Sequence, residues 1–153
     1  MTIRESDKKD MPEILALMKE LINEHHRLDP YYKEFSRYRG LKSYILDSIK
    51  NVNWISLVAV EGEEIVGYFI GEIAEAPFYS SEKWVGVVAD TAVKKELRRK
   101  GILKALFKEA MQRFQKQGVN YIELSVDTRN SAAVAAWKNL GFTDYKLRLR
   151  KKI

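Results

Sequence analysis

The sequence predicts an α/β (α+β) fold in which a mixed sheet carries helices on both faces. Two apolar runs, residues 54–61 and 64–74, flank the turn pair Gly62-Glu63, a pattern typical of an antiparallel hairpin. A valine-rich run at 85–93, a helical stretch and an alternating run at 119–127 follow one another as a βαβ unit. The two strands of such a unit are expected to be parallel, because the crossover helix returns the chain to the same edge of the sheet.

Two helical regions are predicted in the first third of the chain. The first begins near Asp10, which forms a capping-box-like pair with Glu13 before apolar residues recur at helical spacing. Asp29-Pro30 ends this helix, since proline disfavours the helical conformation of the residue before it. Residues 31–49 predict a second helical region, interrupted near Gly40.

The remaining elements are read from glycines and from alternation. A short strand is expected at residues 2–5. The helix that begins at Gly101 has the clearest apolar face in the chain. Asn130 is expected to cap a short helix that ends at Gly141. Residues 142–152 alternate between apolar and charged side chains and predict a final strand.

Composition limits the class of protein. The chain has no cysteine, which excludes disulfides and thiolate nucleophiles and fits a reducing cytoplasm. No apolar run approaches the roughly 20 residues of a membrane span, and the first residues lack the apolar core of a signal peptide. With 153 residues, 46% of them hydrophobic, we expect one cytoplasmic domain over residues 1–153 with no membrane partner. His25 and His26 are adjacent and have no evident third ligand, so no metal is expected.

Positive charge is concentrated in two stretches of a chain whose net charge is +6. Residues 94–104 carry six positive charges and one negative charge, and residues 146–152 carry five positive charges. The first stretch joins a predicted strand to a helix through a loop with one glycine, Gly101. Unpaired N–H groups at a helix start, the helix dipole and a glycine that permits close approach together indicate a phosphate site. The second stretch fits a solvated surface or an anionic partner.

The motifs exclude two common phosphate-binding folds and resemble a third. There is neither a Gly-x-x-x-x-Gly-Lys-Ser/Thr motif nor an early Gly-x-Gly-x-x-Gly motif. Residues 98–103 (RRKGIL) resemble the pyrophosphate loop of the GCN5-related N-acetyltransferase (GNAT) family. Residues 130–142 resemble its late Asn…Ala…Tyr…Gly-Phe signature, and residues 3–12 resemble its first strand and helix. The resemblance implies a GNAT-like, mostly antiparallel sheet of six to seven strands with the parallel βαβ unit in the middle.

The family resemblance implies acetyl-CoA as cosubstrate and an amine as acceptor. The backbone N–H groups from Arg99 to Leu103 would hold the pyrophosphate, and basic side chains would add charge. Leu103 stands where the family usually has Gly or Ala, and its place in the apolar stripe predicts that its side chain turns into the core. Asn130 would contact the pantetheine arm or act as a simple helix cap. The expected cofactor-binding residues are Ala92, Val93, Arg98, Arg99, Lys100, Gly101, Ile102, Leu103, Lys104, Asn130, Ala133 and Trp137.

The reaction implied by the family is direct attack of a neutral amine on the thioester carbonyl. A base must remove a proton from the amine, and a donor must stabilise the oxyanion. The resemblance implies a backbone N–H near Ala92 or Val93 as that donor. Asp90 is the nearest carboxylate on the same strand, and Glu72 and Glu75 on the preceding strand are the other candidates for the base.

The family's frequent general acid is a tyrosine, and Trp137 occupies its position here. An indole N–H donates a hydrogen bond but has no useful acidity, so it cannot protonate a leaving thiolate. Three interpretations follow: Trp137 lines the site while solvent protonates the thiolate, another phenol such as Tyr145 serves, or the protein binds acetyl-CoA and catalyses poorly.

The acceptor residues are predicted from segments that would border the site. Acidic and aromatic side chains there, Asp29 among them, suit a cationic amine, which favours a small or polyamine-like acceptor. A protein or peptide amine is the first alternative. A non-catalytic module that binds acetyl-CoA or nucleic acid is the second, although nucleic acid is not the expected partner. A homodimer is plausible for such a fold. The candidate substrate-binding residues are Tyr31, Tyr32, Glu34, Glu72, Glu75 and Tyr79.

Overall fold

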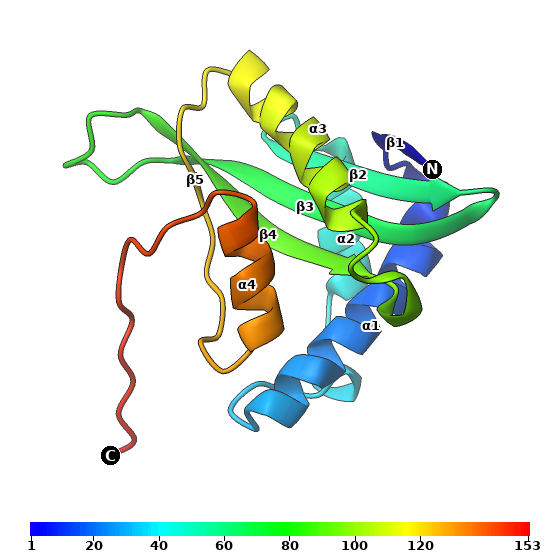
Figure 1. Cartoon of the computed structure of the whole chain (residues 1–153), viewed down its shortest axis with the longest axis horizontal. Helices are drawn as coiled ribbons and strands as arrows, with labels where there is room; N and C mark the ends of the chain where they lie inside the picture. Colours follow the sequence, from blue (N-terminus) through cyan, green and yellow to red (C-terminus); the bar gives the residue numbers. More distant parts are fainter.

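The computed structural model describes residues 1–153 and contains one five-stranded sheet in the order β1-β2-β3-β4-β5 (Figure 1). The first four strands are antiparallel to their neighbours, whereas β4 and β5 are parallel. This arrangement confirms the predicted fold class, the hairpin across Gly62 and the βαβ unit. The strands are β1 (Thr2–Glu5), β2 (Trp54–Glu61), β3 (Glu64–Glu75), β4 (Trp84–Val93) and β5 (Ile122–Glu123).

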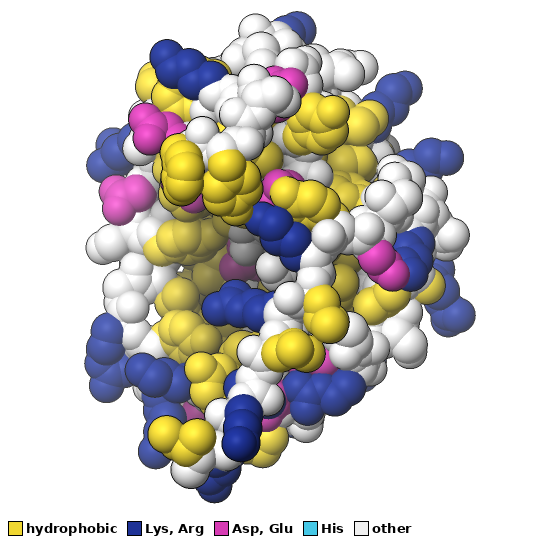
Figure 2. Space-filling model, turned by 90° about the vertical axis from the view of Figure 1, so that its left-hand side faces the viewer, with side chains coloured by type: hydrophobic (Ala, Val, Ile, Leu, Met, Phe, Trp, Pro, Cys, Tyr) yellow, Lys and Arg dark blue, Asp and Glu magenta, His cyan; other side chains and the backbone are white.

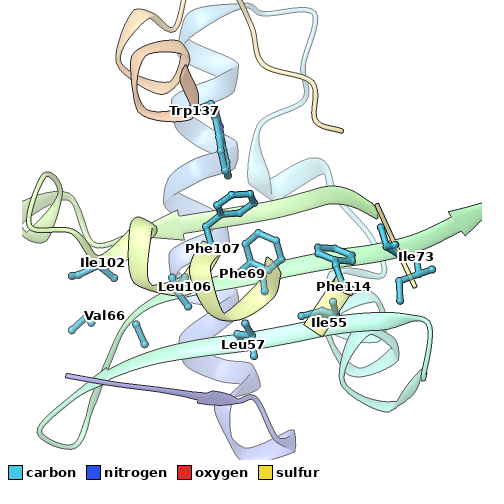
Figure 3. Close-up of a cluster of buried hydrophobic side chains, with 13 residues drawn as sticks. Ile55, Leu57, Val66, Phe69, Ile73, Ile102, Leu106, Phe107, Phe114 and Trp137 are labelled. Atoms are coloured by element: carbon cyan, nitrogen blue, oxygen red, sulfur yellow. The ribbon is translucent and has the colours of Figure 1, made fainter. Parts of the chain in front are cut away.

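Helices cover both faces of the sheet and create two apolar cores. The helices are α1 (Met11–Leu28), α2 (Leu41–Lys50), α3 (Ile102–Lys116) and α4 (Ser131–Asn139). Alternation along β3 sends Phe69 toward α3 and α4, and sends Tyr68 and Ile70 toward α1 and α2. Figure 3 shows the first of these cores, in which Phe107 of α3 packs between Phe69 and Trp137. The helices therefore fix the sheet from both sides.

The sheet has fewer strands than the six to seven expected. The predicted strand at 119–127 is reduced to the two residues of β5, and residues 142–152 form no strand. Both corrections have one physical cause, which is that a strand exists only where a neighbouring strand offers a ladder. β4 pairs with β5 at only two positions, so the rest of the predicted strands has no partner. The βαβ unit consequently lies at the edge of the sheet rather than in the middle.

Two helix starts also differ from the expectation. The capping box is formed by Asp7 and Asp10, around the short 3₁₀ turn Lys8–Asp10, and not by Asp10 and Glu13. The buried Asp10 carboxylate accepts a hydrogen bond from the Asp7 N–H within this box. It also accepts two from the guanidinium of Arg4, at 2.6 and 2.8 Å. The second helical region is broken at Gly40 as expected, but only α2, which follows it, is α-helical. None of the helices combines the length and apolar character needed to cross a membrane.

Candidate functional site

The candidate site begins where β4 separates from β5. The two strands pair through Gly86 with Ile122 and through Val87 with Glu123. β4 has a bulge just after these pairs. Val88 lies opposite Gly71 of β3 and Asp90 lies opposite the next residue, Ile70, so Ala89 is the extra residue. A bulge bends its strand and increases its twist, and β4 leaves β5 at this point. Since the strands are parallel, α3 and α4 both begin beyond this carboxyl-terminal edge, the place where open α/β sheets bind ligands.

The loop between β4 and α3 presents a run of free backbone donors. Arg99 has a φ of 65° and Gly101 has a φ of 83°, so left-handed residues turn the chain twice before α3 starts. The N–H groups from Arg99 through Lys104 have no acceptor within the protein. Successive N–H groups in such turns form an anion-binding concavity, and the dipole of α3 adds to it. These free donors fit the predicted phosphate site, which stays a prediction.

Some basic side chains of this loop form ion pairs within the protein, and others are free. Arg98 donates to both carboxylate oxygens of Glu24 on α1, at 2.9 and 3.1 Å, and to the carbonyl of Val93. Lys94 is ion-paired with Glu64. Arg99, Lys100 and Lys104 are exposed and make no ion pair, so their charges are available to a ligand. The cofactor role predicted for Arg98 stays a prediction.

Apolar contacts hold the two ends of the loop. Ile102 is buried, and Leu103 and Val93 pack against the same core beneath α3. This confirms that the Leu103 side chain turns inward and leaves its N–H at the helix start. Ala92 packs on the opposite face, toward α1 and α2. The loop backbone is thus anchored in a rigid core on both sides.

Asn130, at the N-terminus of α4, and Trp137, in its last turn, both have structural roles. The Asn130 side chain accepts a hydrogen bond from the Ala133 N–H at 3.1 Å, which confirms the predicted helix cap. Trp137 is 8% exposed and lies edge-on between Phe107 and Phe142, with ring centroids 5.9 and 5.4 Å away. Trp137 is therefore a core residue in this structure, and its roles in catalysis and cofactor binding remain predictions.

Asp90 follows the bulge of β4 and faces α1 and α2. Its Oδ1 accepts a hydrogen bond from Tyr68 Oη at 2.6 Å, and the Tyr68 side chain is fully buried. Burial raises the pKa of the Asp90 carboxyl, while the hydrogen bond from Tyr68 and the nearby charge of His25 partly oppose this effect. Burial also raises the pKa of Tyr44, the phenol from α2 that lies near Asp90 and Glu72. A half-buried carboxylate with a raised pKa is the kind of group that acts as a general base near neutral pH.

The other predicted catalytic and acceptor residues are distributed over β3, two loops and the C-terminal segment. By alternation Glu72 shares the face of Tyr68 and Asp90, whereas Glu75 falls on the opposite face of β3. Tyr31, Tyr32 and Glu34 lie in the connection between α1 and α2, and Tyr79 lies in the loop between β3 and β4. Tyr145 is exposed on the C-terminal segment beside Lys146. The structure therefore brings Asp90 and Glu72 to one face and separates Glu75 from them.

Sequence reasoning missed four residues that the fold places beside Asp90 or Asp29. Tyr68 and Tyr44 approach Asp90 from β3 and α2, and Arg129 and Arg150 bind the carboxylate of Asp29. Arg150 belongs to the basic stretch 146–152, but no local signal pairs either arginine with Asp29, which lies 100 and 121 positions away in the chain. Tyr68 could have been noticed in the sequence, because its hydroxyl group lies in a predicted strand where the adjacent residues are all apolar or glycine.

Comparison with known proteins gives three relevant similarities. A mycothiol acetyltransferase from Renibacterium salmoninarum is 32% identical over 102 residues, which is 63% of this chain and 30% of that protein. The BH1408 protein from Bacillus halodurans, in a mutant form, is 21% identical with a TM-score of 0.90, over 100% of this chain and 99% of that one. The aminoglycoside N-acetyltransferase AAC(6′)-Iy in complex with CoA is 16% identical with a TM-score of 0.74, over 99% and 100% of the two chains.

The two structural similarities concern the fold alone, and this chain spans less than a third of the mycothiol acetyltransferase. The family match is broader, because residues 15–142 match the acetyltransferase (GNAT) family. This range includes the loop after β4, the bulge and the start of α4. The chain belongs to the GNAT acetyltransferase family.

Proposed function

We propose that this chain is an acetyl-CoA-dependent N-acetyltransferase that transfers the acetyl group directly to a primary amine. The observation that carries the proposal is the run of N–H groups from Arg99 through Lys104 with no acceptor in the protein. A pyrophosphate needs several convergent donors and compensating positive charge, and this loop supplies both. The structural similarity to an acetyltransferase in complex with CoA supports the same assignment.

The cofactor is assigned to the loop and to the start of α4. The pyrophosphate would lie against the backbone from Arg99 to Lys104, with charge from the side chains of Arg99, Lys100 and Lys104. Arg98 would add its positive charge either while it is paired with Glu24 or after that ion pair has broken. Residues after Glu123 have no ladder partner on β4, so their backbone groups are available to the pantetheine arm.

The chemistry assigned to the chain is general-base catalysis of acyl transfer. Asp90 would accept the proton of the incoming ammonium, directly or through water, so that the amine nitrogen attacks the thioester carbon. A backbone N–H near Ala92 or Val93 would stabilise the oxyanion before the carbon–sulfur bond breaks. The thiolate would take its proton from solvent, because Trp137 has no acidic proton to give.

Two alternatives make different predictions. A peptide N-acetyltransferase would acetylate peptide amines in preference to small amines. A non-catalytic module would bind acetyl-CoA or nucleic acid without turnover, and its binding to nucleic acid would weaken steeply with salt. Turnover with a free amine excludes the second alternative.

Calorimetric titration with acetyl-CoA tests the cofactor site. Gly101→Glu places a carboxylate and a strained residue at the loop, and we expect it to weaken binding at least tenfold. Gly118→Glu is the matched control, because Gly118 ends the same helix with a φ of 75° and equally open space around its Cβ position. Equal affinity of the wild type and Gly101→Glu would overturn the assignment of the loop.

Turnover is then measured by release of the CoA thiol. The chain has no cysteine, so a thiol reagent reports CoA alone. Asp90→Asn is expected to reduce kcat/KM about 100-fold or more, the usual scale of general-base catalysis, while acetyl-CoA affinity is retained. An unchanged rate would exclude Asp90 as the base.

A further inference from the structure

The C-terminal segment, residues 143–153, is held by side chains alone. None of its backbone groups forms a hydrogen bond with another backbone group, and Leu147 and Leu149 are exposed. The segment runs along the left side of Figure 1 and therefore lies at the front of Figure 2. There it lies beside a hollow around which Lys and Arg side chains gather. Its position on this side of the molecule is therefore set by charged and aromatic contacts.

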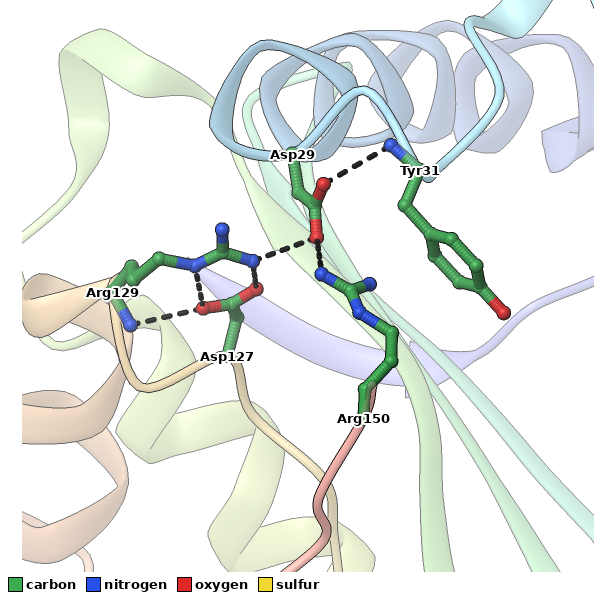
Figure 4. Close-up of polar contacts among 5 residues, drawn as sticks. All are labelled: Asp29, Tyr31, Asp127, Arg129 and Arg150. Carbon is green, nitrogen blue, oxygen red and sulfur yellow. Dashed lines mark hydrogen bonds and ion pairs between the residues drawn. The ribbon is translucent and has the colours of Figure 1, made fainter. Parts of the chain in front are cut away.

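The main contact of the segment is Arg150 with Asp29 (Figure 4). One oxygen of the Asp29 carboxylate accepts from Arg150 at 2.6 Å and from Arg129 at 2.8 Å. The other oxygen accepts from the Tyr31 N–H at 3.0 Å. The hydrogen bonds from the two arginines hold the pKa of Asp29 well below its usual value, so it stays ionised. A carboxylate that is 10% exposed and already satisfied has little capacity for a cationic ligand.

The two guanidinium groups retain donors that Asp29 does not use. Arg129 engages its other partner, Asp127, through Nε and Nη2, and its Nη1 makes no hydrogen bond. Arg150 uses only Nη2, so its Nε and Nη1 are free. Half of each arginine side chain is exposed, and Arg150 is held in place by the Tyr31 ring, 4.4 Å from its guanidinium carbon. A guanidinium fixed in this way is suited to a carboxylate or phosphate.

A row of rings leads from Arg150 to His25, a residue that influences the proposed base. His25 is one of the groups that lower the pKa of the Asp90 carboxyl, and the His25 ring is 6.4 Å from that of Tyr32. Tyr32 is 5.5 Å from Tyr31, which carries Arg150. One end of this row therefore has a carboxylate for an amine, and the other end has guanidinium donors.

We propose that the acceptor is an amine that also carries an anionic group, a carboxylate or a phosphate, which binds Arg150 and Arg129. The inference rests on the proposed function and names the substrate class of the same site. It reverses the expectation from sequence that Asp29 and its neighbours select a cationic, polyamine-like acceptor. The remaining charges of the segment act in the same direction, because residues 146–152 carry five positive charges and no negative one.

The test compares amines of equal length that differ in one end group. Aminohexanoate and aminohexyl phosphate carry an anion, aminohexanamide is the neutral counterpart, and diaminohexane is the polyamine-like counterpart. We expect kcat/KM to be about tenfold higher for one or both anionic amines than for the amide, and lowest for the diamine. The ranking of carboxylate against phosphate distinguishes the two possible anions.

Arg150→Gln is expected to lower the ratio of anion to amide toward one, and Arg129 would supply the preference that remains. Arg148→Gln is the matched control, because it removes the same charge from an exposed position of the same segment that has no ion pair. A ratio that is unchanged in Arg150→Gln, or a wild type that prefers the diamine, would overturn the inference.

Equilibrium binding of the same four amines to the CoA complex separates this inference from the proposed function. Anionic preference in binding without any turnover would refute the proposed function and leave the inference standing. Turnover with no preference for an anion, in rate or in binding, would refute the inference and leave the function standing.

Discussion

Replacement of Tyr68 by Phe removes one hydrogen bond from the proposed base and leaves a fully buried ring in place. The Tyr68 hydroxyl donates to Asp90 at 2.6 Å, and this hydrogen bond lowers the Asp90 pKa against the effect of burial. A hydrogen bond to a charged group contributes about 1.5–3 kcal/mol, compared with about 0.5–1.5 kcal/mol to a neutral one. The difference of roughly 1–1.5 kcal/mol corresponds to about one pKa unit. We therefore expect Tyr68→Phe to raise the Asp90 pKa by about one unit.

Two measurements check this expectation. The acidic limb of kcat/KM against pH should move upward by about one unit, because the base must be ionised. The free energy of unfolding should fall more at about pH 8 than at about pH 5. The sign follows from the raised pKa, since the stability linked to Asp90 is fully present below its unfolded pKa and is lost as pH rises through the folded pKa.

Tyr44→Phe is the control for Tyr68→Phe. It removes a phenol near Asp90 that makes no hydrogen bond to the carboxylate. An acidic limb that stays in place in Tyr68→Phe, together with equal destabilisation at both pH values, would refute the reasoning. A shift of the same size in Tyr44→Phe would show that the hydrogen bond is not its cause.

Three further predictions concern the core, the C-terminal segment and the loop. Trp137→Ala should lower the free energy of unfolding by about 3–5 kcal/mol. Trp137→Phe should retain kcat, because the indole is not expected to act as the general acid. A large loss of kcat in a stably folded Trp137→Phe would contradict that expectation. Asp29→Asn should release residues 143–153, seen as faster tryptic cleavage there, and an unchanged cleavage rate would show another anchor. Glu24→Gln should free Arg98 and tighten acetyl-CoA binding a few-fold by calorimetry, whereas Glu20→Gln on the same helix should not.

Three features with their own local signal were predicted correctly. The apolar stripe of α3, the turn at Gly62 and the cap at Asn130 are properties of contiguous residues, so the sequence contains what is needed to place them. The strands at 119–127 and 142–152 were mistaken because alternation describes the faces of a strand and not its partner. The bulge at Ala89 decides where β4 leaves β5, and no residue pattern in β4 announces it.

The candidate site also has a local part and a long-range part. The loop after β4 could be proposed from the sequence, whereas the surroundings of Asp29 could not. The donors from Arg99 to Lys104 belong to the backbone of one loop, and no distant side chain satisfies them in the folded protein. Asp29 is different, because its meaning for a ligand depends on Arg129 and Arg150, which reach it from 100 and 121 positions away. These arginines change a local attraction for cations into a surface whose free donors favour anions. The charge that a ligand meets is therefore a property of the assembled network, and the acceptor has to be inferred from the fold rather than from the acidic residues of one segment.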